Sequence, residues 1–285
     1  MNMQHKALSE LYFEWNIPLI IVCLAIAFLY EHKRKTMEFH LTKNQKISFH
    51  LGVSLLAVSL GSPLNSVGHY LFSVHMFIQS IIYLAVPPLI LFGLPKKEVG
   101  KLINKYKIVR KTIHIVTKPV LAILLFNVVF SFYHVPFIFD FIMGNQLYIN
   151  LSILFLFFLS FIMWWPILPP VDSIEGMKPL YKIAYICGMG ILLTPACALI
   201  IFSKDILYSS YMHMPRLFGI GTLDDQQAGG ALMKIIQEAI YGSVLAVIFF
   251  KWAKEQRNLD LESEIDRKEE EYLQKFRNID TDSLS

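Results

Sequence analysis

A stretch near residue 212 combines soft sulfur ligands with an imidazole. Met212, His213 and Met214 follow one another in YMHMPRLFGIGTLDDQQAGGALMK, a segment that separates two long apolar runs. Thioether and imidazole groups together favour Cu(I), whereas imidazole with carboxylate suits other metals. The triplet therefore predicts a shallow, exchangeable copper site, provided that it faces the compartment from which copper arrives.

A second group of candidate ligands lies inside two other apolar runs. His75 and Met76 are adjacent, Gln79 follows one helical turn later, and His134 lies seven residues after Asn127 in NVVFSFYHVPF. Polar groups at membrane depth are costly and tend to mark function. We expect His75, Met76 and His134 to form a deeper metal site, supported by Gln79 and Asn127. The structural alternative stays open, because a buried Met is a common core residue and an intramembrane His often bonds a neighbouring helix.

Further polar residues gather where the last apolar run begins. Asp224, Asp225 and Gln226 precede it, and carboxylates there would favour the positive end of a helix dipole. Because a ligating imidazole needs a partner for its second nitrogen, we expect these residues to support the metal site or to dock a partner protein. Within the run, Lys234 and Glu238 are one turn apart. They either form a structural ion pair or leave Glu238 to the site.

The composition indicates which elements must position these residues. Of 285 residues, 55% are hydrophobic and only 17% are charged, whereas a soluble domain is about 25% charged. A helix needs about 20 mostly apolar residues to cross a bilayer. The sequence therefore predicts an all-α, polytopic membrane protein in contact with the lipid bilayer. Its seven transmembrane helices, within 1–252, are expected at 13–30, 47–67, 70–94, 119–138, 147–168, 181–203 and 229–252.

The basic residues sort onto one side of these spans. Of the 26 Lys and Arg residues, five lie in 31–46, eight in 95–118, two in 169–182 and seven from Lys251 onward. By the positive-inside rule these segments face the cytoplasm. The N-terminus and residues 204–228 are then outside, at the end of the spans that carries His75 and His134. Residues 253–285 are predicted to form a charged cytoplasmic tail, helical or disordered.

Several sequence blocks, taken in order, resemble the multi-pass CtaG family of cytochrome c oxidase assembly factors. They are His75-Met76, AVPPLILFGLP from Ala85 to Pro95, YHVP from Tyr133 to Pro136, WWPI from Trp164 to Ile167, and DDQQAGGALM from Asp224 to Met233. The blocks cover roughly residues 70 to 250. Their joint order and spacing make the resemblance more specific than any one block.

The resemblance implies a plasma-membrane protein, not an enzyme, that helps to make an active caa-type oxidase by assisting its copper centres. It implies oxidase subunits as partners and copper as a transient ligand. The site residues that it carries over are His75, Met76, His134, Asp225 and Gln226. One position departs from the family pattern, because many relatives have a second His four residues after the first, where this chain has Gln79. A metal site built on two histidines of one helix face would therefore be incomplete here.

Other protein classes fit the sequence less well. A retinal protein would need a Lys near the middle of its last span, whereas Lys234 lies near the outer end of that run. A desaturase-type metalloenzyme would need HxxxH and HxxHH clusters, which the sequence lacks. No nucleic-acid partner is expected. A transporter of a small solute or metal stays the alternative, because Glu238 and the outer Met and His residues permit it.

Overall fold

The computed structural model describes residues 14–37, 39, 41–171 and 177–282 of the chain, and the regular elements in these ranges are all helical. The predicted first span begins at residue 13, outside the described residues. The chain divides into two compact units, Met1–Tyr241 and Gly242–Ser285. The first unit contains all the candidate site residues. The predicted boundary after residue 252 stays a prediction.

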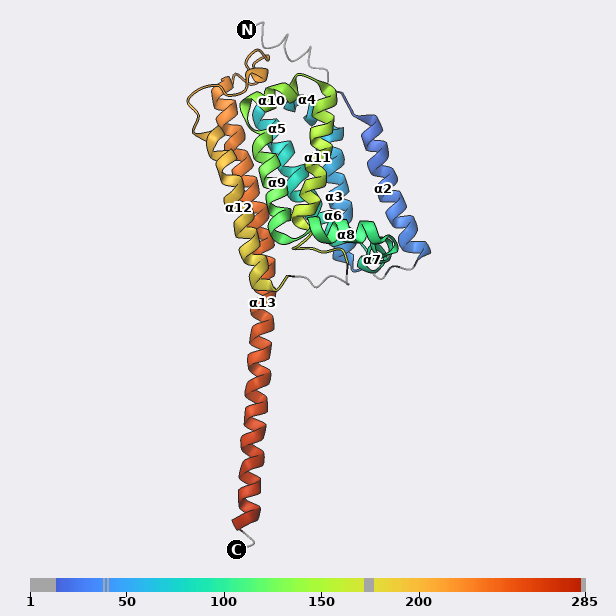
Figure 1. The fold of residues 1–285 in the computed structure, drawn as a ribbon, viewed down its shortest axis with the longest axis vertical. Helices are drawn as coiled ribbons and strands as arrows, with labels where there is room; N and C mark the ends of the chain where they lie inside the picture. The colour runs from blue at the N-terminus through green and yellow to red at the C-terminus, as the bar shows by residue number, and fades with distance from the viewer. Residues whose placement is uncertain (1–13, 38, 40, 172–176, 283–285) are drawn as a thin grey trace. The chain divides into compact units, whose positions relative to one another are not determined.

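The helices follow the apolar runs closely, and four of those described begin with a proline: Pro63, Pro119, Pro136 and Pro179. Proline suits the first helical turn because the N–H that it lacks has no intrahelical partner there. The elements, shown in Figure 1, are α2 (Ile17–Thr36), α3 (Lys43–Gly61), α4 (Pro63–Gly68), α5 (Phe72–Ser80), the π-helix η1 (Ile81–Ala85), α6 (Val86–Gly93), α7 (Lys96–Lys105), α8 (Lys107–Val116), α9 (Pro119–Tyr133), α10 (Pro136–Met143), α11 (Gln146–Trp164), α12 (Pro179–Ile201), the 3₁₀ turn η2 (Ser209–Tyr211) and α13 (Thr222–Asp282).

Within the first unit, α11 packs against α9 and α6, and α3 packs against α2 and α6. The α3–α6 contact is close because Gly93 has no side chain: a Cβ there would lie 2.6 Å from Cβ of Phe49. The hydroxyl of Tyr30 in α2 donates to the Gly93 carbonyl at 2.8 Å. The short helices α4 and α10 lie at one end of this unit, and α7 and α8 lie at the other (Figure 1).

The π-helix η1 joins α5 and α6 into one run from Phe72 to Gly93. Its cause lies in Pro87 and Pro88, which have no N–H to donate to the carbonyls one turn earlier. The N–H of Val86 instead donates to the carbonyl of Ile81, five residues back. The run therefore crosses two prolines without ending, and it carries His75 near its start.

Four helices among the described residues are long and apolar enough to cross a membrane: Phe72–Gly93, Gln146–Trp164, Pro179–Ile201 and the helix from Thr222. The count is five if α8 and α9, which are bent by 73°, form one broken span. The predicted spans 13–30 and 47–67 fall on α2, α3 and α4, which are not among these candidates. α2 includes Glu31, Lys33, Arg34 and Lys35 in its last turns. The prediction of an all-helical membrane protein therefore holds, whereas the count of seven stays a proposal.

Candidate functional site

His134 is fully buried at the C-terminal end of α9. The helix ends there because Val135 precedes Pro136 and takes an extended conformation, as residues before proline prefer. The Nδ1 atom of His134 lies 2.7 Å from the carbonyl oxygen of Phe130. A carbonyl can only accept, so Nδ1 carries the hydrogen and Nε2 keeps a lone pair. This Nε2 atom is buried, and no described residue gives it a hydrogen bond.

That arrangement meets one requirement of a histidine that binds a metal. In metal sites the second ring nitrogen usually donates to a carbonyl, a carboxylate or water, which fixes the tautomer and the ring orientation. Here the Phe130 carbonyl performs this function, one turn earlier in the same helix. The chain therefore presents one imidazole lone pair whose direction is already set.

His75 is partly buried on α5 and shares a hydrogen-bonding group with α9. Its Nε2 lies 3.1 Å from the hydroxyl of Tyr133 and 3.0 Å from Nε2 of Gln79. Tyr133 directly precedes His134, and the two rings are 5.1 Å apart. Tyr133 therefore links the surroundings of the two histidines. Gln79 contacts His75 itself.

Aromatic rings enclose both histidines. Phe139 of α10 lies 5.6 Å from the His75 ring and 4.5 Å from the Tyr208 ring, measured between centroids. The hydroxyl of Tyr208 donates to the His134 carbonyl at 2.9 Å. We call this group the aromatic cluster; its members are Phe72, His75, Phe130, Tyr133, His134, Phe139, Tyr208 and Tyr211. The cluster surrounds the histidines mostly with apolar ring surface.

Asp225 caps the helix that carries His75. Its carboxylate accepts hydrogen bonds from the backbone N–H of Phe72 at 2.6 Å, from that of Ser73 at 3.1 Å and from the Ser73 hydroxyl. The N-cap of α5 is Leu71, an apolar residue that has no side-chain acceptor to offer. A carboxylate from α13 therefore satisfies two of the free N–H groups at the start of α5. The neighbouring Asp224 is exposed instead.

The next two residues hold the segment that follows α12. Oε1 of Gln226 accepts from the backbone N–H of Leu207 at 2.7 Å, and Nε2 of Gln226 donates to the Asp205 carbonyl at 3.2 Å. Nε2 of Gln227 donates to the Ser203 carbonyl at 2.8 Å. The DDQQ sequence therefore joins the start of α13 to two separate backbone segments. These hydrogen bonds fix the helices around the histidines rather than the imidazoles themselves.

Asp140 and the tyrosines of the cluster were not among the predicted site residues. The Asp140 carboxylate accepts four hydrogen bonds, one from the backbone and one from the hydroxyl of each of Ser209 and Ser210. Burial by itself would raise the pKa of Asp140, but these hydrogen bonds outweigh it and lower the pKa. A sequence signal existed, since Asp140 is the only Asp, Glu, Lys or Arg between residues 119 and 168.

The Met-His-Met triplet lies at the surface. Tyr211 is buried and donates to the Gly68 carbonyl at 2.8 Å, but the next three residues are exposed, Met212 to 39% and Met214 to 38%. The triplet therefore directly follows an anchored residue of the aromatic cluster. The chain brings the two histidines into one buried cluster and leaves the second set of soft ligands outside it.

The remaining predicted residues are spread through the first unit. Met76 is fully buried. Asn127 lies deeper in α9, where its amide donates to the Ile123 carbonyl at 2.8 Å and lies 3.9 Å from the Met163 sulfur. Glu238 is paired with Lys234 at 2.7 Å, and its side chain is 61% exposed. This is the geometry expected if the two residues form a structural ion pair. Within the described residues, no three His, Cys, Asp or Glu side chains are grouped to hold a metal.

The fold and this site define an all-helical protein with four or five candidate membrane spans and a buried histidine cluster at one end. The chain belongs to the cytochrome c oxidase caa3 assembly factor family (Caa3_CtaG), whose model matches residues 26–255. The match confirms the predicted family, and it includes all the candidate site residues. Comparisons with curated proteins and with solved structures gave no match.

Proposed function

We propose that this chain helps to form a copper centre of a caa-type oxidase by handling Cu(I) as cargo at the outer face of the plasma membrane. The family supports the assembly role. The observation that carries the copper step is the buried Nε2 lone pair of His134, whose ring is oriented by the Phe130 carbonyl. Imidazole and thioether donors suit copper better than they suit hard cations.

The proposed copper ligands form two separate groups, one exposed and one buried. Met212, His213 and Met214 are exposed and would collect Cu(I) in an exchangeable way, because a surface triplet holds an ion loosely. His134 would accept it in the aromatic cluster. His75 would take part once Tyr133 and Gln79 release its Nε2, so its binding would be reversible. Reversible binding suits a protein that must deliver its cargo to an oxidase subunit.

The proposal also includes the orientation of the chain in the membrane. Seven spans, with the N-terminus outside and the C-terminus in the cytoplasm, put the basic segment 95–118 inside and the Met-His-Met triplet outside. In a variant without native cysteines, Arg216→Cys should react with an impermeant thiol reagent on intact cells, whereas Asn104→Cys should react only after lysis. Both positions are exposed, so access to the side chain does not bias the result. Labelling with the opposite pattern would refute this orientation.

Deletion of this protein tests whether a copper-dependent oxidase needs it for assembly. Loss of the chain should abolish copper-dependent oxidase activity and lower the copper content of the purified oxidase, while a quinol oxidase that does not need this assembly step stays active. Whole-cell copper should not change. Altered whole-cell copper with a fully loaded oxidase would instead indicate the transporter alternative. Normal oxidase activity and normal oxidase copper would refute the assembly role in this organism.

One observation favours a second role for the same segment, the docking of an oxidase subunit. Phe218 is 75% exposed and has a φ of 58°, a conformation that costs a bulky residue roughly 1 kcal/mol or more. A strained, exposed aromatic side chain is the kind of residue that a partner protein can cover. Phe218→Gly relieves the strain and removes the ring, so it should reduce co-purification of oxidase subunits without reducing stability. Unchanged co-purification would exclude this docking role.

A further inference from the structure

The helix α8 separates its basic residues from its apolar residues. Lys107, Arg110, Lys111 and His114 are spaced three, four and seven residues from the first, which places them on one face. Ile108, Val109 and Ile115 lie on the other side, and Ile108 is 82% exposed. α8 falls entirely within the described range 41–171, and it buries none of its side chains. Both of its faces are therefore open to a partner outside this unit.

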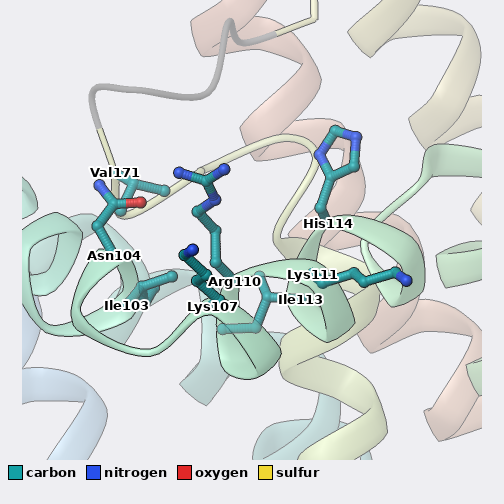
Figure 2. Close-up of a pocket in the computed structure, with 8 residues that line it drawn as sticks. All are labelled: Ile103, Asn104, Lys107, Arg110, Lys111, Ile113, His114 and Val171. Carbon is teal, nitrogen blue, oxygen red and sulfur yellow. The ribbon is translucent and has the colours of Figure 1, made fainter.

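Lys107, Arg110, Lys111 and His114 line one pocket with a volume of about 700 Å³, and its other walls are Ile103, Asn104, Ile113 and Val171. Figure 2 shows Lys107 and Arg110 near its centre, with Asn104 and Val171 on one side and His114 on the other. None of the ion pairs among the described residues includes these four side chains. The carboxylate of Glu98, on the preceding helix, lies 4.0 Å from Lys101. The part of the pocket lining that the structure describes therefore contains three positively charged side chains and no carboxylate.

The direction of α8 supplies the second observation. It is bent by 73° from α9, which enters the apolar part of the protein at Pro119. If α9 crosses the bilayer, a bend of this size lays α8 close to the membrane plane. An amphipathic helix in that position buries its apolar side among the acyl chains and keeps its basic side among the headgroups. Ile108 and Ile115 then contact lipid, and the pocket opens at headgroup level.

We propose that this pocket binds the phosphate headgroup of an anionic phospholipid from the surrounding bilayer. Charge complementarity selects the headgroup, since three Lys and Arg side chains line one pocket that can hold a phosphate. The exposed isoleucines select a lipid over a soluble phosphate, because they need acyl chains to cover them. The site lies on α8, at the opposite end of the unit from α10 and the aromatic cluster (Figure 1), and it does not depend on the oxidase role.

The test uses the full chain, purified in a zwitterionic detergent and titrated with phosphatidylglycerol that carries a fluorescent acyl chain. Lys107→Gln with Arg110→Gln and Lys111→Gln should weaken binding about tenfold or more. The matched control is Lys96→Gln with Lys97→Gln and Lys105→Gln, which removes the same charge from α7 outside the pocket and should weaken binding less than about twofold. If the triple variant aggregates, Arg110→Gln alone should still give about a threefold loss.

Two further binding measurements identify the ligand. Phosphatidylcholine with the same acyl label should bind much more weakly, and glycerol 3-phosphate at millimolar concentration should not displace phosphatidylglycerol. Equal binding of the two lipids would overturn the proposal, because the charge of the headgroup would then not select the ligand. Equal losses in both triple variants would show diffuse attraction rather than a pocket. Displacement by glycerol 3-phosphate would make the ligand a soluble anion.

Discussion

At the end of the helical unit that carries the aromatic cluster, Asp140 and Asp225 each accept several hydrogen bonds from other elements. At the end formed by α7 and α8, the cations Lys107, Arg110 and Lys111 are exposed, and Ile108 is uncovered. Burial and capping hold the helices of the first end in place. The second end leaves its side chains free to adapt to what binds them. A preorganised ligand site and a membrane surface require these opposite properties.

The largest stability effect is expected at Asp225. Asp225→Ala leaves the buried N–H groups of Phe72 and Ser73 without an acceptor, which should cost about 3 kcal/mol of unfolding free energy. Asp224→Ala is the matched control, because its exposed side chain should contribute less than about 0.5 kcal/mol. Thermal unfolding of both variants in the same detergent measures the difference. Equal melting temperatures would show that the DDQQ sequence does not organise the histidine end.

A smaller effect is expected at Asp140, where Asp140→Ala should cost about 1–2 kcal/mol. The variant should also make the segment 203–221 more sensitive to limited proteolysis, because Ser209 and Ser210 lose their acceptor. Ser210→Ala removes one of the four hydrogen bonds and should have a fraction of this effect. If the proteolysis of Asp140→Ala matches that of the wild type, Asp140 does not anchor this segment.

The same carboxylate predicts a pH dependence. The folded-state pKa of Asp140 lies below the ordinary aspartate value of about 4. The ionised form is therefore the one that folding favours, and its contribution is complete above that ordinary value. It is lost as the pH falls through the lowered pKa. The difference in stability between wild type and Asp140→Ala should shrink in this acidic window, and a difference independent of pH would contradict the assignment.

The smallest stability effect is expected at the exposed triplet. Met212→Ala with Met214→Ala should change the unfolding free energy by less than about 0.5 kcal/mol, because neither side chain is buried. Oxidase activity should nevertheless fall in copper-limited medium and recover when copper is added, since only the collecting step is weakened. Full activity in copper-limited medium would remove the triplet from the copper path.

The sequence predicted the elements better than it predicted their contacts. Long apolar runs located α5, α11 and α12, and prolines explain where α9 stops and why η1 forms. The role of Asp225 could not be predicted, because its partners Phe72 and Ser73 lie 153 and 152 residues away. A spacing rule describes one helix face, whereas a cap supplied by another helix depends on tertiary packing. Tyr133 is adjacent to the predicted residue His134, but its hydrogen bond to His75 depends on how α5 packs near α9.

The most direct test of the account is the Cu(I) affinity of the purified full chain, measured by competition with a chromophoric chelator. The account predicts that His134→Ala loses affinity by at least about tenfold. Tyr208→Phe is the matched control, because it removes a hydrogen bond to the His134 carbonyl but leaves the imidazole and its Nδ1 contact intact; it should bind nearly as well as the wild type. If His134→Ala binds Cu(I) as tightly as the wild type, His134 is not a copper ligand and the central claim is wrong.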